Sequence, residues 1–133
     1  MKILIAEDDL VSRKLMYKLL APYGECDMVV DGMEALDAYF MSMKDEEPYD
    51  LICLDIMMPK VDGVKVLKAI RDWESQKGFK GQPVKVIMTT ALAEADYVRS
   101  AFEIGCDAYA AKPIDTAKLL EVIGKLGFTA DLS

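Results

Sequence analysis

The stretch that decides the fold runs from Tyr49 to Gly63 and reads YDLICLDIMMPKVDG. Its first half contains an uninterrupted apolar run, Leu51 to Leu54, which is typical of a buried strand. Its second half contains Pro59 and Gly63 and indicates a loop. Asp55 stands at the junction, where the backbone leaves the sheet, so its carboxylate can face a crevice.

Three further apolar runs of the chain end in the same way, in polar or charged side chains. They end in the acids Glu7-Asp8-Asp9, in Thr89-Thr90 and in Lys112. A parallel sheet would bring all four carboxyl ends together at one edge, where such sheets bind their ligands. Three acids, a hydroxyl group and an ammonium group would then share one pocket, which suits a metal ion and a phosphoryl group.

Along the whole chain, strand-like and helix-like segments alternate. Strands are predicted at residues 2–6, 27–30, 51–54, 84–88 and 108–111, and helices at residues 10–20, 33–44, 63–74, 93–104 and 116–126. Residues 75–82 lack apolar periodicity and are predicted to form a solvated loop. Val11 and Phe40 are predicted to lie on the buried faces of the first two helices. Five such alternations predict an α/β fold, with a five-stranded parallel sheet that helices cover on both faces.

Length and composition fit one globular domain. The chain has 133 residues and 53% of them are hydrophobic, which is enough to bury a sizeable core. No run approaches the roughly 20 apolar residues needed to span a bilayer, and the apolar N-terminus is too short for a signal peptide. We therefore expect a cytoplasmic protein without a membrane partner. Residues 1–127 are expected to form the domain, and residues 128–133 a short C-terminal tail.

Charge and residue usage exclude several functions. The formal net charge is -7, which argues against direct binding to nucleic acid, because phosphate contacts need clustered lysines and arginines. The chain has no histidine, which excludes catalysis by histidine and argues against a zinc or iron site. The three cysteines, Cys26, Cys53 and Cys106, lack metal-ligand spacing and are expected to be buried free thiols.

The acids that follow the first strand have two interpretations. Together with Asp55 and a backbone carbonyl from the loop after it, Glu7 and Asp8 could hold Mg²⁺, which prefers oxygen ligands. Alternatively, Asp8 or Asp9 could cap the helix that begins near Leu10. Four polar groups at four neighbouring strand ends favour the first interpretation.

The same four strand ends suggest how a phosphoryl group would be handled. Asp55 could act as a nucleophile and form an acyl phosphate. Lys112 could pair with one phosphoryl oxygen as a point charge, and Thr90 could donate a hydrogen bond to another. Taken singly, Lys112 could be a surface lysine and Thr90 an ordinary strand residue.

Here the sequence resembles a known family, the receiver domains of two-component response regulators, including the stand-alone chemotaxis type. The resemblance covers residues 2–126 and rests on ILIAEDD at residues 3–9, LDIMMP at residues 54–59 with Asp62-Gly63, Thr90-Ala91, and YAAKP at residues 109–113. It implies the flavodoxin-like strand order 2-1-3-4-5. It also implies a signalling domain, not an enzyme, whose only chemistry is its own phosphorylation and dephosphorylation.

The resemblance assigns a metal site. Asp55 would be the phosphoacceptor and a Mg²⁺ ligand, Asp8 would bind the ion directly, Glu7 would act through water, and Met57 would supply its backbone carbonyl. The acidic pair could also be Asp8-Asp9. Glu7-Asp8 is preferred because the family pattern then continues through the following helix without a gap.

The resemblance also assigns a switch and partners. Thr90 and Lys112 would contact the phosphoryl group, the Lys112-Pro113 bond would be cis, and Tyr109 would be the aromatic residue whose rotamer reports activation. A histidine kinase or histidine phosphotransfer protein would be the donor. An unidentified downstream protein would bind the face built from the fourth helix, fifth strand and fifth helix, and a homodimer could form on phosphorylation.

Two other interpretations compete with a stand-alone receiver. Small phosphatases similar to the haloacid dehalogenases also place an aspartate at a strand end, but they need a second acid two residues later as general acid. Met57 occupies that position and cannot transfer a proton. The chain could also be a receiver domain from a larger regulator, which the sequence does not separate from a stand-alone protein.

Overall fold

The computed structural model describes residues 1–76, 81–91 and 95–130. Its elements are β1 (Lys2–Ala6), α1 (Leu10–Leu20), the 3₁₀ turn η1 (Ala21–Tyr23), β2 (Glu25–Val29), α2 (Gly32–Lys44), β3 (Leu51–Asp55), α3 (Gly63–Gln76), β4 (Lys85–Thr90), α4 (Ala95–Ile104), β5 (Ala108–Ala111) and α5 (Thr116–Lys125). The predicted loop at residues 77–80 and the predicted helix start at residues 93–94 lie outside the described residues.

The five strands form one parallel sheet in the order β2-β1-β3-β4-β5. This order confirms the predicted flavodoxin-like α/β fold. The direction of strand addition reverses between β1 and β3, so the crevice for a ligand is expected at their carboxyl ends. In the register of the sheet, Ala6 lies opposite Leu54, and Asp55 lies opposite Thr89. The residues that follow β1 and end β3 are therefore neighbours in space.

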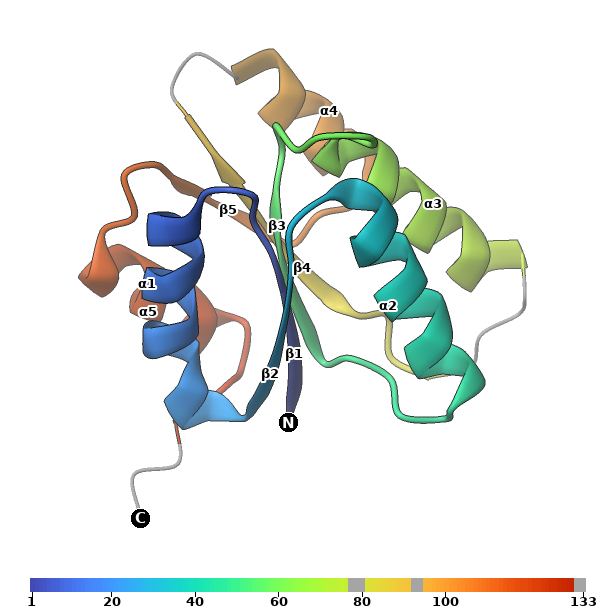
Figure 1. The fold of residues 1–133 in the computed structure, drawn as a ribbon, viewed down its shortest axis with the longest axis horizontal. Coiled ribbons are helices and arrows are strands. Elements are labelled where there is room, and N and C mark those ends of the chain that lie inside the picture. Colours follow the sequence, from blue (N-terminus) through green and yellow to red (C-terminus); the bar gives the residue numbers. More distant parts are fainter. Residues whose placement is uncertain (77–80, 92–94, 131–133) are drawn as a thin grey trace.

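Helices cover both faces of the sheet (Figure 1). α1 and α5 lie on one face, and α2, α3 and α4 lie on the other. Successive strand side chains point to opposite faces of the sheet. In β1, Ile3 and Ile5 therefore join the core beneath α1 and α5, whereas Leu4 and Ala6 join the core beneath α2, α3 and α4. Every residue of β3 is buried, as expected for a central parallel strand with both faces covered.

Two residues predicted to be buried are exposed instead. Val11 is 75% exposed, because it lies in the first turn of α1, whereas the buried residues of this helix, Met16 and Leu20, lie further along it. Phe40 is 38% exposed, because Tyr39, its neighbour on α2, takes the buried position against the sheet. In both helices the apolar stripe is narrower than the periodicity predicted.

Two expectations from composition can be compared with the structure. All three cysteines are free; Cys53 and Cys106 are buried as expected, and Cys26 is partly exposed. Among the described residues, no helix combines the length and the apolar character needed to cross a bilayer.

Candidate functional site

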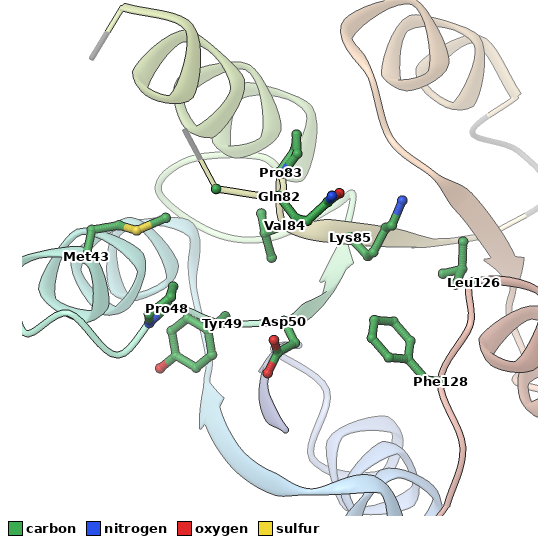
Figure 2. Close-up of a pocket in the computed structure, with 11 residues that line it drawn as sticks. Met43, Pro48, Tyr49, Asp50, Gln82, Pro83, Val84, Lys85, Leu126 and Phe128 are labelled. Carbon is green, nitrogen blue, oxygen red and sulfur yellow. The ribbon is translucent and has the colours of Figure 1, made fainter. Parts of the chain in front are cut away.

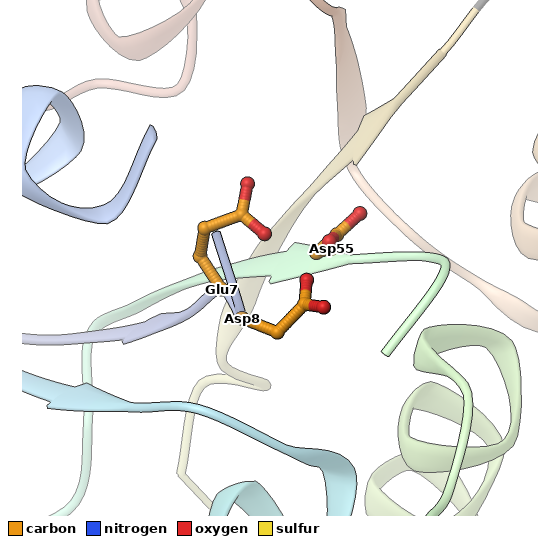
Figure 3. Close-up of side chains that lie close together, drawn as sticks. All are labelled: Glu7, Asp8 and Asp55. Atoms are coloured by element: carbon orange, nitrogen blue, oxygen red, sulfur yellow. The ribbon is translucent and has the colours of Figure 1, made fainter. Parts of the chain in front are cut away.

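Three acids meet at the carboxyl ends of β1 and β3 (Figure 3). One carboxylate oxygen from each of Glu7, Asp8 and Asp55 lies within 4.8 Å of the other two. Glu7 and Asp55 are each 3% exposed, whereas Asp8 faces solvent. The pairing of β1 with β3 brings these residues together, as the sequence predicted. The cluster therefore has a buried base and one side open to a ligand.

Lys112 completes the cluster from the end of β5. Its ammonium nitrogen lies 2.6 Å from Oε1 of Glu7 and 3.0 Å from Oδ2 of Asp55. The Lys112 amide donates a hydrogen bond to the Thr90 carbonyl at 2.7 Å, which extends the pairing of β4 and β5 to this residue. The following peptide bond, Lys112-Pro113, is cis, as the resemblance implied. One cation is thus shared between two buried carboxylates.

The charges of the cluster are not balanced by Lys112 alone. Burial, reinforced by the hydrogen bond and charge of Glu7, raises the pKa of Asp55 to about 8, although Lys112 acts in the opposite direction. Burial lowers the pKa of Lys112, but its hydrogen bonds to Glu7 and Asp55 outweigh burial and the net direction is upward. Converging oxygen ligands with excess negative charge fit a divalent cation such as Mg²⁺.

Met57 lies beside the carboxylate of Asp55 in the loop between β3 and α3. Its amide donates a hydrogen bond to Oδ1 of Asp55 at 3.3 Å. Its carbonyl accepts no hydrogen bond from the residues that the structure describes, so the oxygen is available to a metal ion. Its side chain is 51% exposed and carries no acid or base.

The third acid of the run, Asp9, has a different role from Glu7 and Asp8. Its carboxylate accepts a hydrogen bond from the Ser12 amide at 2.8 Å and caps α1. This hydrogen bond is also the main reason that the pKa of Asp9 is lowered. The capping interpretation therefore applies to Asp9, and the acids gathered near Asp55 are Glu7 and Asp8.

Arg13 contacts the same loop and was not predicted as a site residue. Its Nη1 donates to the carbonyl oxygens of Glu7 at 3.0 Å and Asp8 at 3.3 Å. It therefore fixes the backbone that carries both acids. Two signals in the sequence pointed to it: a basic residue one helical turn after the acidic run, and the family pattern that continues from Glu7-Asp8 into the following helix.

Thr90 and Tyr109 lie on the neighbouring strands β4 and β5. Thr90 is buried at the end of β4, and its hydroxyl donates to the Ala91 carbonyl at 3.0 Å. Tyr109 is half-exposed, and its ring meets the edge of Phe102 with centroids 6.0 Å apart. Thr90 and Tyr109 both line a cavity of about 170 Å³, whose other walls are Ala91, Ala95, Val98 and Ala111. The two residues predicted to form a switch thus share one small apolar space.

A separate cavity of about 370 Å³ lies at the opposite end of the sheet (Figure 2). It is lined by residues that precede β3, including Tyr49 and Asp50, by Val84 and Lys85 near the start of β4, and by Phe128 after α5. Asp50 is held there by the Lys2 amide, which donates to its carboxylate at 2.8 Å. This cavity is therefore at the wrong end of β3 to include Asp55.

Known proteins with similar sequences include hybrid signal transduction histidine kinase L from Dictyostelium discoideum. The identity is 36% over 127 residues, which covers 95% of this chain but only 7% of that protein. The chain thus corresponds to a small part of this much longer relative.

The solved structures that are similar over nearly the whole chain include the following two. One is the co-crystal structure of the Saccharomyces cerevisiae histidine phosphotransfer signaling protein Ypd1 with the receiver domain of its downstream response regulator Ssk1. Its TM-score is 0.81 at 27% identity, over 96% of this chain and 88% of that one. The other is the CheX-CheY-BeF3-Mg²⁺ complex from Borrelia burgdorferi, with a TM-score of 0.79 at 27% identity, over 95% of this chain and 88% of that one. The family model of the response regulator receiver domain matches residues 3–124, and the chain belongs to this family.

Proposed function

We propose that the chain accepts a phosphoryl group on Asp55, and that Mg²⁺ binds through Glu7, Asp8, Asp55 and the Met57 carbonyl. One observation carries the proposal: the buried Asp55 carboxylate lies among acids that fit a divalent cation, with Lys112 3.0 Å away. Family membership supports a phosphoryl-accepting role, and the donor set supports the choice of ion.

The proposed reaction follows from what surrounds the Asp55 carboxylate. One of its oxygens attacks the phosphorus atom, a phosphorus–oxygen bond forms, and the phosphorus–nitrogen bond to a donor imidazole breaks. The Met57 amide, 3.3 Å from Oδ1, holds the carboxylate in place. Lys112 moves from the carboxylates to a phosphoryl oxygen and offsets its charge. Bound Mg²⁺ would reduce the repulsion between the carboxylates and the incoming phosphoryl group.

A donor imidazole must lie outside this chain, because the chain contains no histidine. We propose a histidine kinase or a histidine phosphotransfer protein. The similarity to a hybrid histidine kinase and to the complex of Ypd1 with a receiver domain supports this choice. A phosphatase is disfavoured, because Met57 stands where such an enzyme needs an acid.

The output is proposed to leave through Thr90 and Tyr109. Thr90 would move toward a phosphoryl oxygen, and the Tyr109 ring would then turn into the cavity that both residues line. This changes the surface formed by α4, β5 and α5, where we propose that a downstream protein binds. The phosphoryl group shifts the population between two states only by the contacts that differ between them.

The test is incubation with a phosphoramidate and Mg²⁺, followed by intact-mass measurement. The wild-type chain should gain the mass of one phosphoryl group, and Asp55→Asn should gain none. Asp50→Asn is the matched control, because Asp50 lies at the opposite end of β3 and asparagine retains a hydrogen-bond acceptor for the Lys2 amide. Full labelling of Asp55→Asn would refute the assignment.

A further inference from the structure

The loop between β3 and α3 is closed tightly onto the strand that carries Asp55. The Gly63 amide donates to the Ile56 carbonyl at 2.7 Å, and the Met58 amide donates to the same oxygen at 3.3 Å. A Cβ atom on Gly63 would lie 2.2 Å from the Asp55 carbonyl oxygen, so α3 can begin this close to β3 only with glycine. The base of the loop is thus fixed by its own chain.

The tip of the same loop rests on another element, the N-terminus of α2. The Gly32 amide donates to the Pro59 carbonyl at 3.2 Å. The Lys60 ammonium lies 3.4 Å from Oδ2 of Asp31, whose side chain is 9% exposed. A Cβ atom on Gly32 would lie 1.9 Å from the Val61 carbonyl oxygen. The loop and α2 are therefore in backbone contact that any larger residue at position 32 would push apart.

The backbone of Lys60, beside this contact, has an uncommon conformation. Its φ angle is 70°, in the left-handed region that non-glycine residues rarely adopt. A conformation of this kind costs about 1–3 kcal/mol and persists only where the surroundings hold it. The Val61 amide donates to the Pro59 carbonyl at 2.8 Å and closes a tight turn around Lys60. Gly32 donates to the same carbonyl and contacts Val61, and Lys60 itself pairs with Asp31. The N-terminus of α2 thus adds to the loop's own turn in holding this shape.

We propose that Asp31 and Gly32 are positioning residues for the phosphorylation site. They hold the loop so that the Met57 amide stays at 3.3 Å from Asp55 and the Met57 carbonyl stays beside the acid cluster. Neither residue belongs to that cluster, and both contact the loop at residues 59–61. The part of the inference that concerns the ion rests on the proposed Mg²⁺ site, whereas the part that concerns Met57 does not.

Gly32→Ala should lower the Mg²⁺ affinity by roughly tenfold to a hundredfold, the usual cost of losing support for a metal ligand. Calorimetric titration with MgCl₂ measures it. Gly124→Ala is the matched control, because a Cβ atom on this α5 residue would meet nothing within 4 Å. Lys60→Met is a milder variant that retains the backbone contact, and an affinity loss of about twofold to fivefold is expected from losing one ion pair. Its control is Lys125→Met, which removes an exposed pair with Glu121 in α5.

A second readout uses the metal-free protein and separates this inference from the proposed function. The Met57 amide resonance should shift in Gly32→Ala and Lys60→Met and stay unchanged in both controls. If the wild-type chain binds no Mg²⁺ but Met57 shifts in the two variants, the proposed metal site fails and the positioning role stands. If Gly32→Ala does not fold, Lys60→Met decides the question. A Met57 resonance that does not move in any folded variant overturns the inference.

Discussion

Lys112 lies closer to Glu7 than to Asp55, with its ammonium nitrogen 2.6 Å from the first carboxylate and 3.0 Å from the second. The single cation is thus divided between two buried acids. Asp55 receives only part of its charge, and this is why burial and Glu7 together still raise its pKa. The Asp55 carboxylate is therefore held in a state that a second cation would relieve.

Without metal, Asp55→Asn should stabilise the protein at high pH. The pKa of Asp55 is raised from 3.8 to about 8, so the folded protein binds this proton more tightly than the unfolded chain does. Stability from this group is therefore fully present below about pH 4 and is lost as the pH rises toward about 8. Asparagine carries no charge, and we expect a gain on the order of 1–3 kcal/mol near the upper end of this range.

Urea unfolding in a chelator, at several pH values, measures this difference. The two proteins should be equally stable at a pH near 3.8, the ordinary pKa of Asp55, and their unfolding free energies should diverge as the pH rises. Asp50→Asn serves as the control, because Asp50 is exposed at the opposite end of β3. Equal stability of Asp55→Asn and wild type at high pH would show that Asp55 is not under charge repulsion.

Mg²⁺ binding should be favoured by high pH, because an ion binds Asp55 only after its proton leaves. With the pKa of Asp55 at about 8, the apparent affinity should rise with pH up to that value and then level off. A hundredfold excess of free Mg²⁺ over Kd should stabilise the fold by about 2.7 kcal/mol. Thermal melting with and without MgCl₂ at different pH values measures both effects. An unchanged midpoint at millimolar Mg²⁺ would argue strongly against the site.

Thr90→Ala should still accept a phosphoryl group but switch poorly. The acid cluster and Lys112 remain intact in this variant, whereas the hydroxyl at the wall of the cavity shared with Tyr109 is lost. NMR shifts of residues in α4 on addition of beryllofluoride should be smaller than in wild type. Thr89→Ala is the control, because the neighbouring side chain on a strand points to the other face. Responses equal to wild type would remove Thr90 from the mechanism.

Arg71 should be important for stability and not for phosphorylation. Its guanidinium donates to the Gly105 carbonyl at 3.0 Å and pairs with Glu74 at 2.8 Å and with Asp107 at 3.2 Å. It thus ties α3 to the segment between α4 and β5. Arg71→Met leaves the buried carboxylate of Glu74 and the partly exposed carboxylate of Asp107 without this partner. It should cost roughly 3 kcal/mol, with unchanged labelling of Asp55.

Lys68→Met is the matched control for this prediction. Lys68 lies on the same helix and pairs with Asp72 at 2.9 Å, but both side chains are exposed. Its loss should cost less than about 1 kcal/mol. Equal unfolding free energies for the two variants, measured in urea, would contradict the importance assigned to Arg71.

The site was predictable because its residues stand at strand ends. Once the sheet is parallel, the positions of Glu7, Asp55 and Lys112 follow from topology alone, and no side-chain packing needs to be known. The starting point of β2 was less predictable. It begins at Glu25, two residues earlier than expected, because an edge strand tolerates the polar residues Glu25 and Asp27 that weaken an apolar signal.

Contacts between distant loops could not be predicted. The bond from Gly32 to Pro59 depends on how closely α2 approaches the loop after β3, which no local pattern encodes. The same holds for Arg71, whose contacts with Gly105 and Asp107 join residues that are far apart in the sequence. The predicted burial of Val11 was wrong for a related reason. Periodicity shows which face of a helix is apolar, but it does not show where the sheet beneath that helix ends.

The ion pair between Glu7 and Lys112 joins the start of the chain to its last strand. On a translating ribosome, the acids at the ends of β1 and β3 emerge long before Lys112 does. A nascent fragment therefore presents carboxylates without their lysine, and it lacks the group that would neutralise an incoming phosphoryl oxygen. If Lys112 serves phosphoryl transfer as proposed, competence to receive a signal is acquired only once β5 has joined the sheet.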